Sequence, residues 1–327
     1  MRALVRAESW PIRGGFRIAR GARAEARVVV VELEAEGAVG RGECVPYARY
    51  GESIHSVCAQ IEGAAEGLDL GNAGARVAAL PPGAARNALD CALWDWRAKQ
   101  AGTPVWQLAG LTAPAAQTAT MRTVSVGSAP EMREAALALA ATPVIKVKVD
   151  GGRDLKRIAE VREVAPEAEL VVDANESWSV DQLIDWLPRL PALGVTLLEQ
   201  PLPSDADGAL EGMHRPVPVC ADESFHDSRS FRSVEGRYDV VNVKLDKAGG
   251  LTEALVCLAE AERRGFEVML GCMVSTSLAI APALLLAGAA RYVDLDGPLL
   301  LESDREGALH DRGEGLLRPS PALWGGA

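Results

Sequence analysis

Two lysines and three carboxylates recur along the chain at a nearly constant interval. Lys148, Asp173, Glu199, Asp222 and Lys244 follow one another at steps of 22 to 26 residues. Each of them closes or directly follows a short apolar, β-branched run, such as VIKVK or LVVD. A step of about 25 residues is the length of one strand-plus-helix unit, so successive strands would deliver these groups to the same end of a parallel sheet. In a barrel of alternating strands and helices, that end carries the chemistry.

The rhythm continues over enough of the chain to predict a closed α/β barrel. Helical patterns such as DLKRIAEVREVA and TEALVCLAEAERRG separate the apolar runs. Eight strands are expected, at residues 119–126, 143–149, 169–173, 194–199, 217–221, 239–244, 266–271 and 291–295. Eight strands with intervening helices match the count of a TIM barrel, which we assign to residues 116–304.

Residues 1–115 do not follow this rhythm and predict a separate α+β domain. The runs ARVVVVELEAEG and GAVGRGECVPY look like the strands of an antiparallel hairpin, with turn signals at Glu36–Gly37 and Gly40. Two helical patterns follow, SIHSVCAQIEGAAEGL and AARNALDCALWDWRAKQAG. The polar, Gly/Pro-rich tail from about residue 305 to 327 is expected to pack back on this domain.

Charge and cysteine content exclude several classes of protein. The net charge of −11 argues against nucleic acid or an anionic membrane as a partner. The longest apolar stretch, 279–290, contains Pro282 and is too short to cross a bilayer. The first ten residues lack the apolar core of a signal peptide. Six cysteines without C-x-x-C spacing are typical of reduced thiols in a cytoplasmic protein rather than of a structural zinc site.

The three carboxylates suggest a metal site. Asp173, Glu199 and Asp222 would come from three neighbouring strand ends and leave open positions for a substrate. Oxygen-only ligands of this kind suit a hard divalent cation, and Mg²⁺ is the usual choice. The alternative is that these side chains cap helices or bind loop amides.

The lysines suggest bases that move a proton. Only six of the 34 basic residues are lysine, and four of these six lie in the two segments VIKVK and NVKLDK. Lys146 and Lys148 are two apart on a strand, so both should face the barrel interior. Burial, mutual repulsion and a nearby dication would lower the pKa of a lysine here. Lys244 should approach from the opposite face, whereas Lys247 is expected on a loop beyond the strand; simple ion pairing with the carboxylates is the alternative role.

A further acidic pair follows the eighth expected strand. Asp294 and Asp296 in YVDLDGP should lie on one face, again because they are two residues apart. Excess negative charge beside a metal site requires a positive partner, and the ammonium group of a substrate would serve. A helix cap or a surface turn is the alternative.

The motifs K-x-K, D-A-N, E-Q-P, A-D-E-S and N-V-K-L-D-K-A-G-G, in this order, resemble those of the enolase superfamily, muconate-lactonizing subgroup. The additional D-L-D-G-P, together with GECVPYARYGES and MLGCMVSTS, is similar to the dipeptide epimerases of that subgroup. The resemblance covers almost the whole chain. It implies a modified TIM barrel, (β/α)7β, with an N-terminal α+β capping domain.

The resemblance also implies roles for individual residues. Asp173, Glu199 and Asp222 would bind one Mg²⁺ per subunit, while Lys148 and Lys244 would each take the α-proton from one epimer. Lys146 would tune Lys148 and touch the substrate, and Asp294 with Asp296 would hold the free ammonium of a dipeptide. Contacts with the rest of the substrate are implied for Arg20, Thr123 and Met273. Arg17 and Arg23 are alternatives to Arg20 in the Arg-rich segment, and Ser275 stands where many relatives carry Glu.

The activity implied is 1,1-proton transfer that inverts the α-carbon of the second residue in L-Ala-D/L-Glu-type dipeptides, a step of murein peptide recycling. Rival reactions of the subgroup are o-succinylbenzoate synthesis, muconate cycloisomerisation and N-acylamino acid racemisation. Their substrates lack a free ammonium, so the Asp294–Asp296 pair favours a dipeptide as the small-molecule partner. A retained barrel with only a binding or structural role is the non-enzymatic alternative, and assembly into a homo-oligomer stays open.

Overall fold

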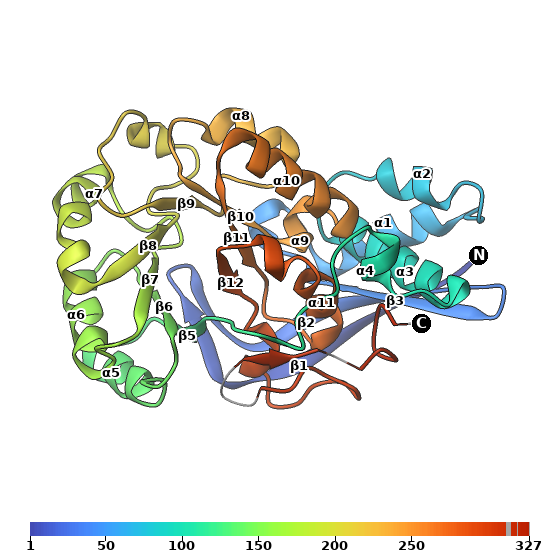
Figure 1. Ribbon diagram of the computed structural model, residues 1–327, viewed down its shortest axis with the longest axis horizontal. Helices are drawn as coiled ribbons and strands as arrows, with labels where there is room; N and C mark the ends of the chain where they lie inside the picture. Colours follow the sequence, from blue (N-terminus) through green and yellow to red (C-terminus); the bar gives the residue numbers. More distant parts are fainter. Residues whose placement is uncertain (312–314, 319, 327) are drawn as a thin grey trace.

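A computed structural model describes residues 1–311, 315–318 and 320–326 of the chain. Its main body is a sheet of eight parallel strands, coloured from green to red in Figure 1. The strands are β5 (Arg122–Val124), β6 (Val144–Lys148), β7 (Glu169–Asp173), β8 (Val195–Glu199), β9 (Val219–Ala221), β10 (Val240–Val243), β11 (Glu267–Gly271) and β12 (Tyr292–Asp294). Each expected strand is present, although the first is much shorter than predicted.

The sheet curls into a nearly closed barrel. The strands pair in chain order from β5 to β12. Across the remaining seam, the Met121 amide donates to the carbonyl of Val293 at 2.9 Å, and the Leu295 amide donates to Thr120 Oγ1 at 2.8 Å. All strands therefore present their carboxyl ends at the same rim, and the predicted α/β barrel is confirmed.

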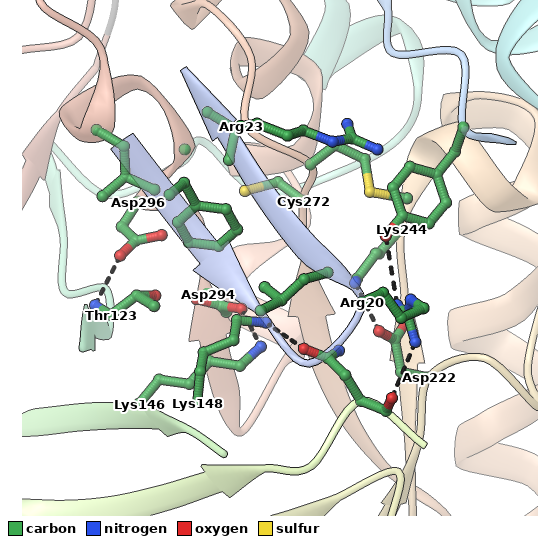
Figure 2. Close-up of a pocket in the computed structure, with 18 of the residues that line it drawn as sticks. Arg20, Arg23, Thr123, Lys146, Lys148, Asp222, Lys244, Cys272, Asp294 and Asp296 are labelled. Atoms are coloured by element: carbon green, nitrogen blue, oxygen red, sulfur yellow. Dashed lines mark hydrogen bonds and ion pairs between the residues drawn. The ribbon is translucent and has the colours of Figure 1, made fainter. Parts of the chain in front are cut away.

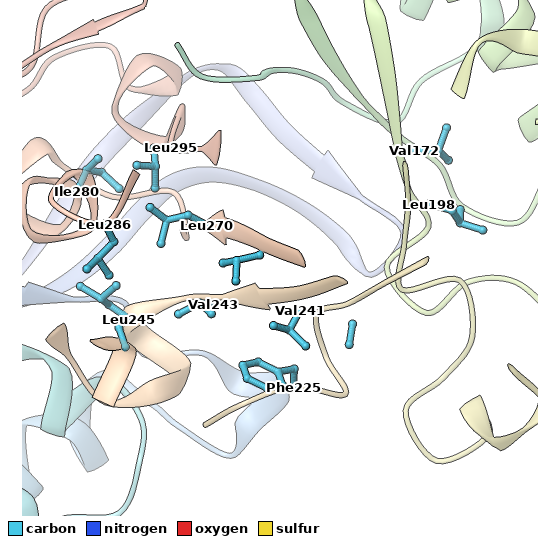
Figure 3. Close-up of a cluster of buried hydrophobic side chains, with 14 of the residues drawn as sticks. Val172, Leu198, Phe225, Val241, Val243, Leu245, Leu270, Ile280, Leu286 and Leu295 are labelled. Atoms are coloured by element: carbon cyan, nitrogen blue, oxygen red, sulfur yellow. The ribbon is translucent and has the colours of Figure 1, made fainter. Parts of the chain in front are cut away.

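Helices and apolar strand residues form the layer outside the strands. The helices are α5 (Ala129–Leu137), α6 (Asp154–Val164), α7 (Val180–Trp186), α8 (Phe231–Val234), α9 (Leu245–Ala248), α10 (Leu251–Arg264) and α11 (Ser277–Leu284). Figure 3 shows part of the buried layer, with Val241, Leu270 and Ile280 among its members. Capping boxes start α5 at Ser128 and α7 at Ser179. No helix in the described residues is long and apolar enough to cross a membrane.

Short 3₁₀ segments complete the connections. They are η1 (Ala48–Tyr50), η2 (Leu187–Arg189), η3 (Pro191–Leu193), η4 (Asp207–Leu210), η5 (Ser228–Ser230), η6 (Ala287–Ala289) and η7 (Gly297–Leu300). Between β8 and β9 the described connection contains η4 and no α-helix. This part of the barrel is therefore built from loop rather than from a full strand-plus-helix unit.

The first part of the chain forms an antiparallel sheet with helices on it, as predicted. The sheet runs in the order β1 (Arg2–Ile18), β2 (Gly21–Ala35), β3 (Ala38–Cys44). The helices are α1 (Ile54–Ala65), α2 (Ala73–Ala78), α3 (Ala84–Ala101) and α4 (Val105–Leu108). The sequence patterns did not predict β1, whose residues are mostly exposed.

The β1–β2 hairpin carries the first domain to the barrel. The pairing register of its two strands shifts between Pro11 and Phe16. The residues before the turn therefore point in a different direction from the rest of β1. In Figure 1 the tip of this blue hairpin lies beside the barrel near β5 and β6. The Val126 amide donates to the carbonyl of Arg17 at 3.1 Å, which fixes the tip against the first barrel strand.

The end of the chain returns to the first domain. Strand β13 (Leu316–Leu317) pairs with β4 (Gln117–Thr118), a two-stranded ladder outside the barrel. Further along, Trp324 Nε1 donates to the carbonyl of Cys91 at 3.0 Å, and the Gly325 amide donates to Asp95 Oδ1 at 2.7 Å. Both partners belong to α3, so the tail closes over the helix of the first domain.

Two glycines of β3 allow α3 to lie directly on the sheet. A Cβ at Gly40 would stand 2.1 Å from the carbonyl oxygen of Ala92, and one at Gly42 would stand 2.1 Å from that of Ala88. The turn predicted at Gly40 is therefore wrong, because this glycine lies inside the strand and serves close packing. The turn predicted at Glu36–Gly37 is present, with φ values of 49° and 77°.

Replacing Gly42 by alanine should destabilise the protein, because backbone atoms of α3 cannot move away from the added methyl group. We expect the free energy of unfolding to fall by about 1–3 kcal/mol, measured by urea denaturation. The control is Gly63→Ala in α1, where an added Cβ meets nothing within 4 Å. That variant should gain about 0.5–1 kcal/mol from helix propensity. Equal stability of the two variants would contradict the close-packing argument.

Candidate active site

A cavity of about 170 Å³ opens at the carboxyl ends of the barrel strands, beneath the hairpin tip. Strand ends supply its charged floor and the hairpin supplies part of its wall. Its charged lining consists of Arg20, Arg23, Lys146, Lys148, Asp222, Glu223, Lys244, Asp294 and Asp296. Figure 2 shows Lys148 and Lys244 entering from different sides. The strand-end placement predicted from the 25-residue rhythm is thus what the structure has.

The three candidate metal ligands come from adjacent strands and are buried. Asp173 and Glu199 end β7 and β8 and face each other in the sheet register, and Asp222 directly follows β9. In the described part of the chain, however, no three Asp, Glu, His or Cys side chains are gathered closely enough to hold a metal ion as they stand. Each carboxylate is turned toward a lysine instead.

Lysine ammonium groups lie among these carboxylates. Lys146 Nζ lies 2.7 Å from Glu199 Oε2, 3.1 Å from Asp173 Oδ2 and 2.6 Å from Asp294 Oδ2. Lys148 Nζ lies 2.6 Å from Asp173 Oδ2, and Lys244 Nζ lies 2.7 Å from Asp222 Oδ2. The ion pairing given above as an alternative role for the lysines is therefore present.

These ion pairs raise the pKa of two of the lysines. Burial lowers the pKa of Lys146, but the charges of Asp294, Glu199 and Asp173 outweigh it and raise the pKa well above its ordinary value. The same competition, with Asp222 as the main partner, raises the pKa of Lys244. For both lysines, attraction to the carboxylates exceeds the cost of burial.

The donor set nevertheless fits a hard dication. Burial and the repulsion of Asp173 raise the pKa of Glu199 to about 7. The positive charge around this carboxylate is therefore too small to offset its burial. Glu199 Oε2 is buried and accepts no well-aligned hydrogen bond, although Lys146 Nζ is near. Asn242 Nδ2 donates to the other oxygen at 2.8 Å and holds the side chain toward the barrel axis. A cation with several oxygen ligands would satisfy these groups.

Lys247 belongs to this cluster, which corrects its predicted place on a loop. It lies in α9, its side chain is fully buried, and its Nζ contacts Asp222 Oδ1 at 2.6 Å. Sequence reasoning missed it because a single helical turn after Lys244 brings it back toward β9. Its membership of the small lysine set was the one available signal.

Gln200 fixes the loop that carries Asp222. Its Oε1 accepts from the amides of Asp222 at 2.9 Å and Ser224 at 3.1 Å, while its Nε2 donates to Tyr238 Oη at 2.9 Å. Gln200 itself has a φ of 35°, a left-handed conformation that is costly without such contacts. The sequence analysis named E-Q-P only as a motif and assigned no role to this glutamine.

The acidic pair at the end of β12 faces the cavity rather than solvent. Asp294 Oδ2 binds Lys146, and Asp294 Oδ1 is buried without a hydrogen-bond partner in the described residues. Asp296 Oδ2 accepts from the amide of Thr123 at 2.9 Å, and burial with repulsion from Asp294 raises its pKa to about 6. The surface-turn alternative for the pair is therefore wrong.

The three arginines of the hairpin differ in their surroundings. Arg20 is paired with Glu223 at 2.5 Å and with Glu176 at 3.2 Å. Arg23 lies over the ring of Tyr47, 5.0 Å from its centre, and lines the cavity without an acidic partner among the described residues. Arg17 is exposed and does not line the cavity. Arg20, expected to meet the substrate, is already occupied by the barrel's own carboxylates.

The connection after β11 forms another part of the wall. Met273 lines the cavity, as expected, and its carbonyl accepts from Ser275 Oγ at 3.1 Å. Ser275 itself is buried. The next residue, Thr276, is held by Glu43 of the first domain through its amide at 2.8 Å. The wall therefore depends on a contact between the two parts of the chain.

Comparisons with known proteins cover both parts. Residues 1–110 match the family model described as mandelate racemase / muconate lactonizing enzyme, N-terminal domain, and residues 131–310 match the model described as enolase C-terminal domain-like. An L-Ala-D/L-Glu epimerase of Escherichia coli is 48% identical over 92% of this chain and 95% of its own. An N-acetyl-D-glutamate racemase of Pseudoalteromonas is 43% identical over 92% and 96%.

Solved structures agree with these matches. An enolase family member from Agrobacterium tumefaciens, with homology to dipeptide epimerases and with bound sodium and L-Ala-L-Glu, superposes with a TM-score of 0.95. It is 43% identical, and the match covers 99% of both chains. A dipeptide epimerase from Enterococcus faecalis, complexed with Mg and L-Leu-L-Tyr, gives a TM-score of 0.90 at 28% identity over 98% and 96%.

The segment after Lys244 is anchored to the first domain by a buried acid. Asp246 Oδ1 accepts from the Val45 amide at 2.9 Å and from Asn87 Nδ2 at 2.9 Å. Burial raises the pKa of Asp246 to about 7 despite these two donors. The native state therefore binds a proton that the unfolded chain has already released above pH 4 or so.

Stability should consequently fall as pH rises from about 4 to 7, because ionising Asp246 costs more in the native state than in the unfolded chain. Asp246→Asn removes this titration. We expect the variant's free energy of unfolding, relative to wild type, to improve by roughly 2–4 kcal/mol over that range. Urea denaturation of both proteins at several pH values measures the difference between their free energies of unfolding. The contributions of other titrating groups are the same in both proteins and cancel in this difference. A difference that stays constant with pH would contradict the role of burial.

Proposed function

The chain belongs to the mandelate racemase / muconate lactonizing enzyme family of the enolase superfamily and is a dipeptide epimerase, and we propose that it inverts the second residue of L-Ala-D/L-Glu-type dipeptides with the help of Mg²⁺. The observation that carries the proposal is the pair Lys148 and Lys244 in one cavity. Their strands, β6 and β10, have three strands between them in an eight-stranded barrel, so they lie on opposite sides.

Opposed amines are what inversion at a carbon requires. Lys148 removes the α-proton from one epimer, and Lys244 delivers a proton to the opposite face to give the other epimer; in the reverse direction the two lysines exchange these roles. Lys146, held among Asp173, Glu199 and Asp294, adds positive charge beside Lys148 and the substrate carboxylate. No covalent intermediate is needed for this exchange of a hydrogen.

Asp173, Glu199 and Asp222 would hold one Mg²⁺ per subunit. A dication there supplies stabilisation of the negative charge that develops on the substrate carboxylate when the α-proton leaves. The protein's own part is to present three buried carboxylates from adjacent strands. Glu199, whose pKa burial raises to about 7, is the carboxylate that gains most from such a cation.

The substrate's ammonium group would sit at the β12 acids. Asp294 Oδ1 has no hydrogen-bond partner among the described residues, and Asp296 has one oxygen bound to Thr123, so the pair retains acceptor capacity inside the cavity. A charged donor placed here forms strong, charge-assisted hydrogen bonds. Thr123 would then position Asp296 through its amide, and Met273 would line the cleft from the other connection.

For the second residue's side chain, the geometry favours Arg23 over Arg20. Arg20 already binds Glu223 and Glu176, whereas the Arg23 guanidinium faces the cavity with only the ring of Tyr47 beneath it. A guanidinium without an acidic partner is suited to a carboxylate of the substrate. This supports a dipeptide whose second residue is acidic.

Racemisation of N-acetylglutamate is a second candidate, favoured by the similarity to the Pseudoalteromonas racemase. That substrate has the same acidic side chain but no ammonium group. The two reactions would use the same lysines and differ in their demand on Asp294 and Asp296. We favour the dipeptide, because an uncharged acetamide would leave the two acids without a cation.

The physiological setting we propose is the recycling of murein peptides in the cytoplasm. L-Ala-Glu dipeptides of the required chemistry belong to such peptides, and all six cysteines of the chain are free thiols. Free buried thiols suit a reducing compartment.

Proton exchange provides the direct test of the reaction. In D₂O with Mg²⁺, we expect the α-hydrogen of the glutamate in L-Ala-L-Glu and L-Ala-D-Glu to be replaced by deuterium as the two epimers interconvert, followed by proton NMR. Lys148→Ala and Lys244→Ala should each slow interconversion by about 10³-fold, since each removes one acid–base group. N-acetylglutamate, run in parallel, should exchange more slowly. Absence of exchange with every dipeptide would refute the proposal, and faster exchange of N-acetylglutamate would favour the second candidate.

The choice of arginine is tested by substrate preference. Arg23→Gln should lower kcat/KM for L-Ala-L-Glu by roughly 10- to 100-fold, the loss expected for a charge-assisted hydrogen bond. For L-Ala-L-Gln the loss should be small, because no carboxylate is present. Arg17→Gln is the matched control and should change neither value. If Arg20→Gln rather than Arg23→Gln produced the selective loss, our assignment would be wrong and the earlier expectation for Arg20 correct.

A further inference from the structure

Lys247 makes the closest contacts with a candidate metal ligand, yet it does not line the cavity. Its Nζ lies 2.6 Å from Asp222 Oδ1 and 2.5 Å from the main-chain oxygen of the same residue. Its side chain is fully buried. A lysine that is shut away from the substrate cannot exchange a proton with it, so its role must pass through Asp222.

Asp222 is held on every side. Lys247 binds Oδ1 and the carbonyl, Lys244 binds Oδ2 at 2.7 Å, and Gln200 accepts the amide hydrogen at 2.9 Å. Of the two carboxylate oxygens, only Oδ2 is shared with a residue that lines the cavity. Lys247 therefore sets the orientation of this carboxylate from the side that does not line the cavity.

The backbone places Lys244 and Lys247 on the same helical turn. Lys244 is the N-cap of α9, and the Lys247 amide donates to its carbonyl at 3.0 Å. The helix ends at Gly249 and Gly250, whose φ values are 92° and 110°. A Cβ at Gly250 would lie 2.5 Å from Asp90 Oδ2 of α3, so the double glycine lets this turn sit against the first domain.

We propose that Lys247 is a positioning residue. It binds Asp222 Oδ1 and the main-chain carbonyl of Asp222, so that Oδ2 is the carboxylate oxygen available in the cavity. This inference rests on the proposed function, in which Asp222 helps to bind Mg²⁺ and Lys244 acts as a base. With Lys247 in place, the Asp222 carboxylate keeps its orientation, and Oδ2 would be the oxygen available to a cation in the cavity. Without Lys247, Asp222 loses two buried hydrogen bonds. Its two carboxylate oxygens are then no longer held by different lysines.

Two consequences separate this role from ordinary structural support. Metal affinity should fall, because residues that orient a ligand typically contribute 10- to 100-fold to metal binding or activity. The half-reaction of Lys244 should also suffer more than that of Lys148, because Asp222 contacts Lys244 and not Lys148. A lysine that only stabilised the fold would affect both faces equally.

The experiment compares Lys247→Met with Lys99→Met. Lys99 makes the same kind of contacts far from the cavity, with Asp95 Oδ2 at 2.7 Å and the carbonyl of Val39 at 2.9 Å. Mg²⁺ binding to each metal-free protein is measured by titration calorimetry. We expect a 10- to 100-fold weaker Kd for Lys247→Met and an unchanged Kd for Lys99→Met. An equal or tighter Kd in Lys247→Met would overturn the proposal. It would mean that the Lys247 ammonium only repels the Mg²⁺ ion and does not help to orient Asp222.

The second measurement uses deuterium exchange of each epimer at saturating Mg²⁺. Lys148→Ala and Lys244→Ala first identify which epimer each lysine serves. Lys247→Met should then slow exchange of the Lys244 epimer at least 10-fold more than that of the Lys148 epimer. Equal slowing of both would overturn the proposal. Failure of the wild-type protein to exchange any dipeptide would instead refute the proposed function, and the calorimetric result would still stand by itself.

A folding defect in Lys247→Met would be recognised by circular dichroism and by thermal unfolding. In that case Lys247→Gln replaces it, because the amide keeps a donor for one of the two Asp222 oxygens. We expect an intermediate Mg²⁺ affinity for this variant. A wild-type affinity would overturn the proposal, since a single neutral donor would then be sufficient.

Discussion

Opposite charges that must be buried together determine the arrangement of this molecule. The cavity region holds four ammonium groups and five carboxylates, namely Lys146, Lys148, Lys244, Lys247, Asp173, Glu199, Asp222, Asp294 and Asp296. Neither set could be taken out of water alone, because an unpaired buried charge costs several kcal/mol. The parallel barrel solves this problem by bringing the ends of separate strands to one rim.

The barrel could be predicted because its signal is repeated. Charged residues at the ends of apolar runs recur with every strand-plus-helix unit, so an error in one strand does not change the conclusion. The first domain offers less: β1 was missed because its residues are mostly exposed, and Gly40 resembled a turn although it lies in β3. The requirement for glycine there comes from α3, about fifty residues later in the chain. Such a constraint cannot be read from neighbouring residues.

The site shows the same division. Residues at strand ends, such as Lys148 and Asp294, could be placed from the period alone. Lys247 could not, because a four-residue helix turns it inward after the strand has ended. The partners of Arg20 come from the connections after β7 and β9 and exist only once the hairpin has docked. The raised pKa values of Lys146 and Lys244 could not be predicted either, since burial is visible in a sequence pattern but the number of nearby carboxylates is not.

The tail gives the molecule an unusual order of assembly. Trp324 donates to Cys91, 233 positions earlier in the chain, and Gly325 binds Asp95 on the same helix. During synthesis the first domain emerges early but lacks this cover until the whole barrel has been translated. The surface of α3 that the tail covers therefore stays partly exposed until all the barrel strands have been made. A helix translated before the barrel thus reaches its final packing only through residues translated after the barrel.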